Sequence, residues 1–275
     1  MYEQYWRLTE KPFENVPDPK FIFLSKQHEE ALFRLRYAIE GKKGAALLTG
    51  VFGCGKTLVS RVLMSRLGVG KYKTVCIKNP QMKAVELLRT IARQLGAENL
   101  VARITDMSSE YFRELIEQML FDNTSNGTET IVFIDEAHVI NDPELFDEIR
   151  MLLNLQDEKS FLLTLILMGQ PELIDKVQRN KPLLQRIAIG FDIKPLGDTE
   201  TSNYIKYRLK VAGRTEEIYD KSALSAIYHN SNGIPRRINQ VCDISLLIGF
   251  KEEAKMINED KIKEAISGLG VYKHV

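Results

Sequence analysis

Gly50-Val51-Phe52-Gly53-Cys54-Gly55-Lys56-Thr57 matches the pattern G-x-x-x-x-G-K-S/T at every fixed position. Glycines let successive backbone N–H groups turn around a phosphate, and a helix that follows directs its positive end at the same group. A short apolar stretch, Ala45 to Thr49, precedes the motif, and a helical pattern from about Lys56 to Leu67 follows it. This context argues against a glycine-rich turn with a chance Lys-Thr pair. The sequence therefore predicts a strand, a phosphate-binding loop and a helix.

The loop supplies most of the candidate nucleotide-binding residues. The Lys56 ammonium would reach the β- and γ-phosphates, and the Thr57 hydroxyl would hold Mg²⁺. Cys54 lies inside the loop, where oxidation could block binding, although a small filler is its ordinary role. The candidate residues for ATP or ADP in this part of the chain are Gly50, Gly53, Cys54, Gly55, Lys56, Thr57 and Leu58.

A second motif, Ile131-Val132-Phe133-Ile134-Asp135-Glu136, joins four apolar residues to two carboxylates. The apolar run predicts a strand that is buried on both faces. Carboxylates at its end would be costly to bury without a metal ion or water to receive them, and ligands bind at this edge of an open α/β sheet. Asp135 then suits Mg²⁺ coordination and Glu136 suits polarising the attacking water.

The letters Asp135-Glu136-Ala137-His138 also spell the DEAH box of certain helicases. Those enzymes need two RecA-like domains, and this chain has room for one, so we reject a helicase. His138 by itself is more typical of a helix cap or a core position than of catalysis. The four histidines have no metal-ligand spacing.

Two polar residues further along fit an ATPase whose sites are assembled between subunits. Gln170 follows a predicted strand, Phe161 to Met168, where its side chain could lie between the acidic pair and the γ-phosphate. Arg186 precedes a predicted strand from Ala188 to Ile193. An arginine from a neighbouring subunit would stabilise the charge that develops in phosphoryl transfer. A surface ion pair is the plain alternative for Arg186, and Arg179 is the competing candidate.

The chain changes character near residues 194–198. Before this point strands alternate with helices, including a strand from Thr74 to Lys78 and a loosely helical stretch from Asp106 to Phe121 that leads into a loop at residues 123–127. Such alternation predicts a parallel sheet flanked by helices. After Pro195 only helical patterns follow. We predict an α/β domain over residues 1–195, which begins with an extended, proline-containing segment, and a helical domain over residues 196–275.

Gly233-Ile234-Pro235-Arg236-Arg237 opens one of these C-terminal helices. An arginine here could contact the nucleotide and report its state to the helical domain. Arg236 is the preferred candidate and Arg237 is the alternative. The alternative is that these arginines simply form a basic, solvent-exposed start of the helix.

Composition narrows the class of protein. The 275 residues include 38 Lys or Arg and 37 Asp or Glu, so the formal net charge is +1. This balance weighs against a constitutive nucleic-acid binder. Three cysteines at wide spacings predict neither a disulfide framework nor a zinc site, and favour a reducing compartment. No stretch approaches the roughly 20 apolar residues that span a bilayer, and the N-terminus is not a secretory signal. We expect a cytoplasmic protein unless a partner or a further segment holds it at the inner membrane.

Taken in order, the motifs resemble the ExeA/GspA-type AAA+ ATPases over about residues 1–250. The residues that carry the resemblance are Pro12-Phe13, Pro17-Asp18-Pro19, Phe21, Leu24-Ser25, His28, Glu30-Ala31-Leu32, the phosphate loop, Asp135-Glu136-Ala137, Gly169-Gln170-Pro171-Glu172-Leu173, Gln185-Arg186-Ile187 and Gly233 to Asn239. The resemblance implies an AAA+ core with a helical lid and a site that is shared between subunits.

On this resemblance each candidate takes a named role. Lys56 and Thr57 correspond to Walker A, and Asp135 and Glu136 to Walker B. Gln170 corresponds to sensor 1, where AAA+ proteins more usually carry Asn, Ser or Thr. Arg186 corresponds to the arginine finger and Arg236 to sensor 2.

The resemblance leaves two functions open. The first is an ATP-hydrolysing motor or switch for a bacterial envelope secretion system, acting as a ring or arc of identical subunits on a membrane-associated partner. The alternative is a DNA-associated ATPase of the transposition type, for which the basic residues Arg34, Arg36, Lys42 and Lys43, or Lys206, Arg208 and Lys210, could form a surface. A nucleotide-binding pseudo-ATPase is disfavoured because every catalytic position is filled. Secretion members carry a membrane span and a periplasmic region after the ATPase, so we expect either part of a longer protein or a stand-alone member.

Overall fold

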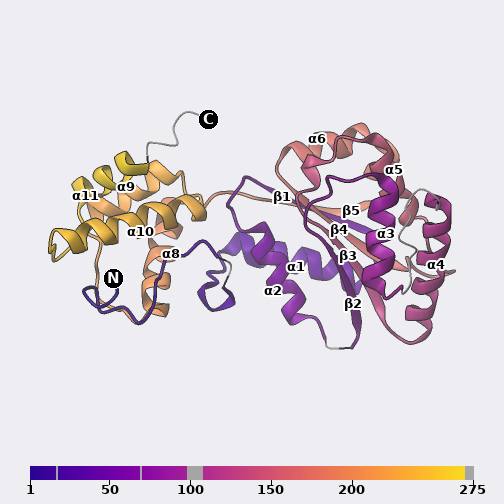
Figure 1. The fold of residues 1–275 in the computed structure, drawn as a ribbon, viewed down its shortest axis with the longest axis horizontal. Helices are drawn as coiled ribbons and strands as arrows, with labels where there is room; N and C mark the ends of the chain where they lie inside the picture. Colours follow the sequence, from indigo (N-terminus) through magenta and orange to yellow (C-terminus); the bar gives the residue numbers. More distant parts are fainter. Residues whose placement is uncertain (17, 69, 98–107, 270–275) are drawn as a thin grey trace. The chain divides into compact units, whose positions relative to one another are not determined.

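A sheet of five parallel strands organises the α/β part of the protein. The computed structural model describes residues 1–16, 18–68, 70–97 and 108–269. Its sheet has the strand order β2-β3-β4-β1-β5 (Figure 1). The strands are β1 (Ala45–Gly50), β2 (Tyr72–Ile77), β3 (Glu129–Ile134), β4 (Leu163–Gly169) and β5 (Ile187–Ile193). All five predicted strands are present, and the predicted fold class is confirmed.

Helices cover both faces of this sheet. Helices α1 and α2 lie on one side, and α3, α4 and α5 lie on the other (Figure 1). Those of the α/β part are α1 (Lys26–Glu40), α2 (Lys56–Arg66), α3 (Ala84–Leu95), α4 (Ser109–Ser125), α5 (Pro143–Leu152), α6 (Glu172–Arg179) and α7 (Lys181–Leu184). Strand β4 is buried at all seven residues, because both of its faces are covered.

The predicted loop at residues 123–127 is only partly a loop. Helix α4 continues to Ser125, and the chain turns at Asn126 and Gly127. The Asn123 side chain donates to the Thr130 hydroxyl at 3.1 Å, which ties the end of the helix to β3. This contact lets a polar asparagine remain helical where the local sequence favours a turn. The predicted start of this helix at Asp106 lies outside the described residues.

The C-terminal part is helical, as predicted. It contains α8 (Asp198–Val211), α9 (Lys221–Ser231), α10 (Pro235–Lys251) and α11 (Glu259–Leu269). Contacts group the chain into two units. The α/β unit is His28–Phe52 with Val59–Ile193, and the helical unit is Met1–Gln27, Gly53–Leu58 and Lys194–Val275.

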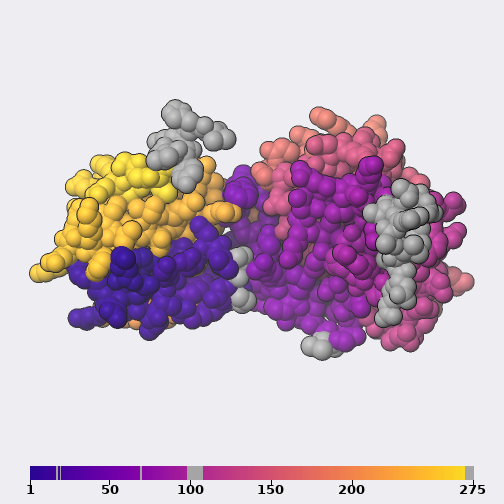
Figure 2. Space-filling view, viewed as in Figure 1, coloured from indigo at the N-terminus to yellow at the C-terminus, as the bar shows by residue number. Residues whose placement is uncertain are grey.

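The N-terminal segment, residues 1–27, thus packs with the C-terminal helices, whereas the predicted boundaries place it with residues 28–195. Figure 2 shows this segment, in indigo, lying against the yellow helices. Trp6 is 3% exposed, and its indole N–H donates to the Leu246 carbonyl at 2.9 Å. Phe13 and Phe21 are buried in the same apolar core. Aromatic residues that had no assigned partner in the sequence therefore complete the core of the helical unit.

Arg208 anchors the same segment from α8. Its guanidinium donates to the carbonyls of Pro12 and Glu14 and to the Tyr204 hydroxyl, and it stacks over Phe21 at 4.9 Å. The residue is 6% exposed. The sequence-based suggestion that Arg208 forms part of a basic surface is wrong, because the side chain is buried and its donors are used inside the protein.

Candidate nucleotide-binding site

The phosphate loop connects β1 directly to α2, as predicted. Strand β1 ends at Gly50 and α2 begins at Lys56. Gly53 and Gly55 have φ values of +87° and +96°, which side chains with a Cβ rarely adopt. Lys56 is 5% exposed and Cys54 is 1% exposed. The loop thus has the strand–glycine–helix geometry that turns backbone N–H groups toward an anion.

The start of α10 packs against this loop within the helical unit. A Cβ added at Gly53 would lie 2.8 Å from the Arg236 Cβ and 3.1 Å from the Ile234 Cγ2. Only glycine leaves room for so close an approach. The structure therefore brings the preferred arginine beside the loop. Ile234 is an additional neighbour that the sequence did not identify, since an apolar residue before a helix carries no signal of a ligand site.

Two other candidates lie at the carboxyl edge of the same sheet. Strands β1, β4 and β3 are adjacent and parallel, and Leu167 pairs with both Leu47 and Ile134. Asp135 follows β3 and Gln170 follows β4, so both residues lie at the edge where β1 ends. This is the edge at which open α/β sheets bind ligands.

Glu136 has an unusual backbone conformation for a residue with a side chain. Its φ is +55°, and its N–H donates to the Asp135 Oδ1 at 2.9 Å. Strain of this kind, of order 1 kcal/mol or more, persists where the surrounding structure enforces it and is common at functional sites. The turn is followed by the 3₁₀ helix η3 (Ala137–Val139).

His138 joins Glu136 to Gln170, which the sequence did not reveal. The Gln170 Nε2 lies 2.8 Å from the His138 Nε2, and the His138 Nδ1 lies 3.3 Å from the Glu136 Oε2. The DEAH spelling was the available signal, because it places a histidine two residues after Glu136. Strand pairing between β3 and β4 was needed to show which side chain it meets.

The two candidate arginines lie elsewhere in the α/β unit. Arg186 precedes β5, whose first residue, Ile187, pairs with Ala45 at the beginning of β1. Its guanidinium donates to the Leu153 carbonyl at 2.7 Å. Arg179 is exposed at the end of α6. Arg186 thus lies at the opposite edge of the sheet from Asp135 and Gln170.

Two of the candidate residues offer the kind of ligand atom that magnesium prefers. Thr57 offers a hydroxyl oxygen in the first turn of α2, and Asp135 offers carboxylate oxygens at the end of β3. Mg²⁺ prefers oxygen ligands and usually takes only one or two from the protein, with phosphates and water supplying the rest. In the described part of the chain no three His, Cys, Asp or Glu residues cluster as a metal site.

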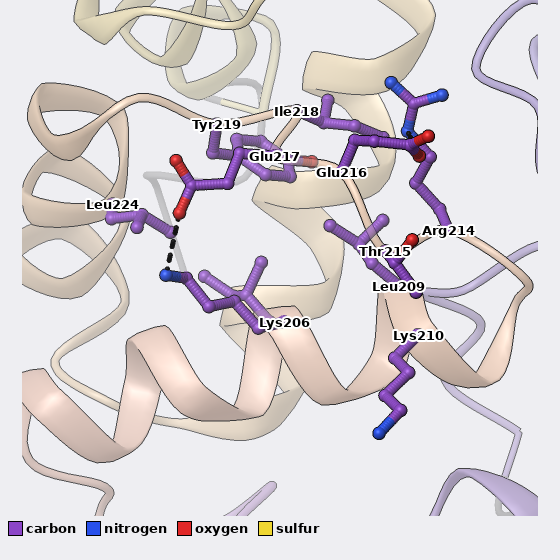
Figure 3. Close-up of a pocket in the computed structure, with 11 residues that line it drawn as sticks. Lys206, Leu209, Lys210, Arg214, Thr215, Glu216, Glu217, Ile218, Tyr219 and Leu224 are labelled. Carbon is purple, nitrogen blue, oxygen red and sulfur yellow. Dashed lines mark hydrogen bonds and ion pairs between the residues drawn. The ribbon is translucent and has the colours of Figure 1, made fainter.

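A separate cavity of about 310 Å³ opens in the helical unit between α8, α9 and the loop that joins them (Figure 3). Leu209, Ile218 and Tyr219 contribute apolar surface to it. Lys206 and Glu217 form an ion pair at 2.9 Å across its rim. The residues that line it include no candidate nucleotide-binding residue, so it is distinct from the phosphate loop.

Comparison with known proteins agrees with this geometry. Residues 39–177, half of the chain, match the family described as "AAA domain". The chain belongs to the AAA domain family. This membership agrees with the P-loop ATPase fold that the sequence predicts. Among its described residues, every helix is too short or too polar to span a lipid bilayer.

Curated relatives of this AAA domain protein include one from bacteria and one from archaea. It is 34% identical to General secretion pathway protein A of Aeromonas hydrophila, over 98% of this chain and 49% of the relative. It is 25% identical to the uncharacterized HTH-type transcriptional regulator MJ0774 of Methanocaldococcus jannaschii, over 85% of this chain and 65% of the relative. The chain thus spans about half to two thirds of these relatives. The predicted resemblance to General secretion pathway protein A is confirmed.

Solved structures share the AAA fold. The Aeropyrum pernix ORC2 protein superposes with a TM-score of 0.69 at 14% identity, covering 94% of this chain and 71% of that one. Drosophila ORC bound to DNA gives a TM-score of 0.70 at 17% identity, with 98% and 66% covered. RuvB of Thermotoga maritima gives 0.56 at 18% identity, with 88% and 69% covered. At such low identity these similarities show the fold alone.

Proposed function

We propose that this AAA domain protein hydrolyses ATP at sites completed by a second copy of the chain, and that the cycle drives or switches assembly of a bacterial envelope secretion system. The position of Arg186 supports the shared site. It precedes β5 at the edge where β1 begins, whereas the phosphate loop follows the other end of β1. Six residues of strand separate these edges by roughly 17 to 20 Å, beyond the reach of an arginine side chain.

In the proposed site, water attacks the γ-phosphorus and the bond from that phosphorus to the β–γ bridging oxygen breaks, giving ADP and phosphate. Lys56 neutralises charge on the β- and γ-phosphates. Thr57 and Asp135 would hold Mg²⁺, which when bound would supply positive charge beside the phosphates. Glu136 orients the water and draws on its proton.

The remaining polar candidates act around this centre. Gln170 would orient groups beside the γ-phosphate from the end of β4. Arg236 would report the nucleotide to the helical unit, and the close packing of its side chain on Gly53 supports that role. Arg186 of one copy would stabilise the transferring phosphoryl group in the site of the next copy, with Arg179 as the alternative.

The secretion role rests on the name of the 34% identical relative, General secretion pathway protein A. We propose that the chain works on the cytoplasmic side of the inner membrane, through a membrane-associated partner. The chain matches only about half of that relative, so the relative's name supports a role for the shared half alone. The partner is therefore to be identified by capture with the ATP-bound protein.

A DNA-associated role is the alternative, and the surface charges weigh against it. The residues considered for a basic surface are largely paired with carboxylates. Arg34 pairs with Glu30, Arg36 with Glu40, Lys42 with Glu129 and Lys206 with Glu217, at distances of 2.6, 2.7, 3.9 and 2.9 Å. Binding phosphates would require these pairs to open, which reduces the gain from counterion release.

ATP turnover per subunit, measured across protein concentration with and without DNA, separates the two functions. Light scattering on the same samples reports the size of the assembly. We expect turnover that rises as the protein assembles and does not change with DNA. Turnover that is independent of assembly would refute the shared site. Turnover or assembly that requires DNA, and that weakens steeply with salt, would establish the DNA-associated alternative.

A further inference from the structure

His138 lies between two side chains to which the proposed mechanism gives separate roles. Its Nε2 is 2.8 Å from the Gln170 amide nitrogen, and its Nδ1 is 3.3 Å from the Glu136 carboxylate. The His138 side chain is 14% exposed and that of Glu136 is 34% exposed. The imidazole is therefore mostly shielded from water, and these contacts are its polar surroundings on both sides.

The contacts of His138 favour one tautomer of the ring. Nδ1 makes no hydrogen bond, but it lies 3.3 Å from the Glu136 Oε2, and because carboxylate oxygens are acceptors, a hydrogen on Nδ1 is favoured over a lone pair there. Nε2 is then an acceptor, and it faces the amide nitrogen of Gln170, which donates. The reverse tautomer would place a lone pair against the carboxylate and require the amide to turn around. The orientations of Glu136 and Gln170 are thus linked through a single ring.

The backbone of His138 is also tightly packed and hydrogen-bonded. A Cβ added at Gly169 would lie 3.0 Å from the His138 N and 3.3 Å from its Cβ, so the end of β4 packs directly on this residue. On the other side, the Lys176 ammonium donates to the His138 carbonyl and, at 2.7 Å, to the Ile140 carbonyl. These contacts fix η3 between β4 and α6.

We infer that His138 is a positioning residue for ATP hydrolysis, which holds the Glu136 carboxylate and the Gln170 amide in one fixed arrangement. This inference rests on the proposed function of Glu136. A change at Gln170 therefore affects Glu136. If the Gln170 amide no longer donates to Nε2, the His138 ring that contacts Glu136 is held less firmly. The effect falls on the chemical step and not on nucleotide binding.

Replacement of His138 separates a positioning role from a structural one. His138→Ala should lower kcat roughly tenfold to a hundredfold, which is the scale for misplacing a reacting group by about 1 Å. KM for ATP and the Kd for ADP should stay within about twofold, and the melting temperature should not fall. His229→Ala, an exposed histidine on α9, is the matched control and should keep the normal rate. A normal kcat for His138→Ala would overturn the inference.

Two further variants examine how the residue acts. Asparagine places an amide nitrogen near the position of Nδ1, so His138→Asn should retain the contact with Glu136 and recover part of the rate even if the alanine variant folds poorly. His138→Ala and Gln170→Ala should together cost less than the product of their separate losses, because both break the same connection. Multiplicative losses, or a His138→Asn rate no better than that of alanine in folded protein, would refute the coupling.

Glu136→Gln distinguishes failure of this inference from failure of the proposed function. If Glu136→Gln abolishes turnover while His138→Ala leaves kcat unchanged, only the positioning role is wrong. If Glu136→Gln hydrolyses ATP normally, the role of Glu136 is wrong, and the inference that rests on it falls as well.

Discussion

Replacing Arg208 by methionine should lower the free energy of unfolding of the helical unit by about 3 to 4 kcal/mol. The side chain is 6% exposed. It donates to the Pro12 carbonyl, to the Glu14 carbonyl at 3.1 Å and to the Tyr204 hydroxyl at 2.8 Å. Methionine fills similar space but donates no hydrogen bond, so the buried Pro12 carbonyl and the partly buried Glu14 carbonyl lose their partner.

The magnitude follows from these contacts. Each hydrogen bond from a charged donor contributes about 1.5 to 3 kcal/mol, and three are lost. Relief of the cost of burying the guanidinium offsets part of that loss, which leaves about 3 to 4 kcal/mol. Arg208→Lys keeps the charge but cannot reproduce the planar set of donors, so it should lose roughly half as much.

Urea unfolding followed by the fluorescence of Trp6 is the suitable assay, because Trp6 is the only tryptophan in the sequence and it is buried in this segment. Lys206→Met is the matched control. It lies on the same helix and removes an exposed ion pair with Glu217, so it should cost less than about 1 kcal/mol. Equal effects of Arg208→Met and Lys206→Met would refute the anchoring role of Arg208.

Four substitutions examine the nucleotide site. Lys56→Ala should abolish detectable ATP binding by calorimetry; micromolar affinity would exclude its phosphate contact. Glu136→Gln should bind ATP normally and slow hydrolysis by at least roughly a hundredfold, as measured by phosphate release. Arg186→Ala should bind ATP but lose the rise of turnover with protein concentration, and if that rise survives, Arg179→Ala becomes the decisive variant. Gly53→Ala should weaken ATP binding roughly tenfold or more, because a Cβ is strained at φ +87° and collides with α10; unchanged affinity would contradict the close packing seen here.

Local sequence patterns predicted the parts of the fold in which neighbours in the chain are also neighbours in space. The apolar run before Gly50 and the helical period after Lys56 defined β1, the phosphate loop and α2 without any distant information. Asp135 and Gln170 were assigned to one edge of a parallel sheet, because the carboxyl ends of parallel strands meet there. The structure has both at that edge.

The contacts that sequence reasoning missed join distant segments. Nothing near His138 indicates that Gln170 is its partner, since that pairing depends on β3 lying next to β4. Arg208 is a different case, because a signal was present. Helical spacing places it on the same face as Tyr204 and beside Ile205 and Leu209, all of which are buried. Counting it with Lys206 as a basic stripe ignored this periodicity.

The union of the N-terminal segment with the C-terminal helices has a consequence for biosynthesis. A ribosome makes Trp6, Phe13 and Phe21 first, but α8 begins roughly 170 residues after this segment ends. Translation adds about 5 to 20 residues per second, so on the order of 10 to 30 seconds pass between the synthesis of these aromatic residues and that of α8. During that interval the α/β unit can already fold, while the segment offers exposed apolar side chains to chaperones. The helical unit is therefore completed late in synthesis, because its core is formed by residues from both the N-terminal segment and the C-terminal helices.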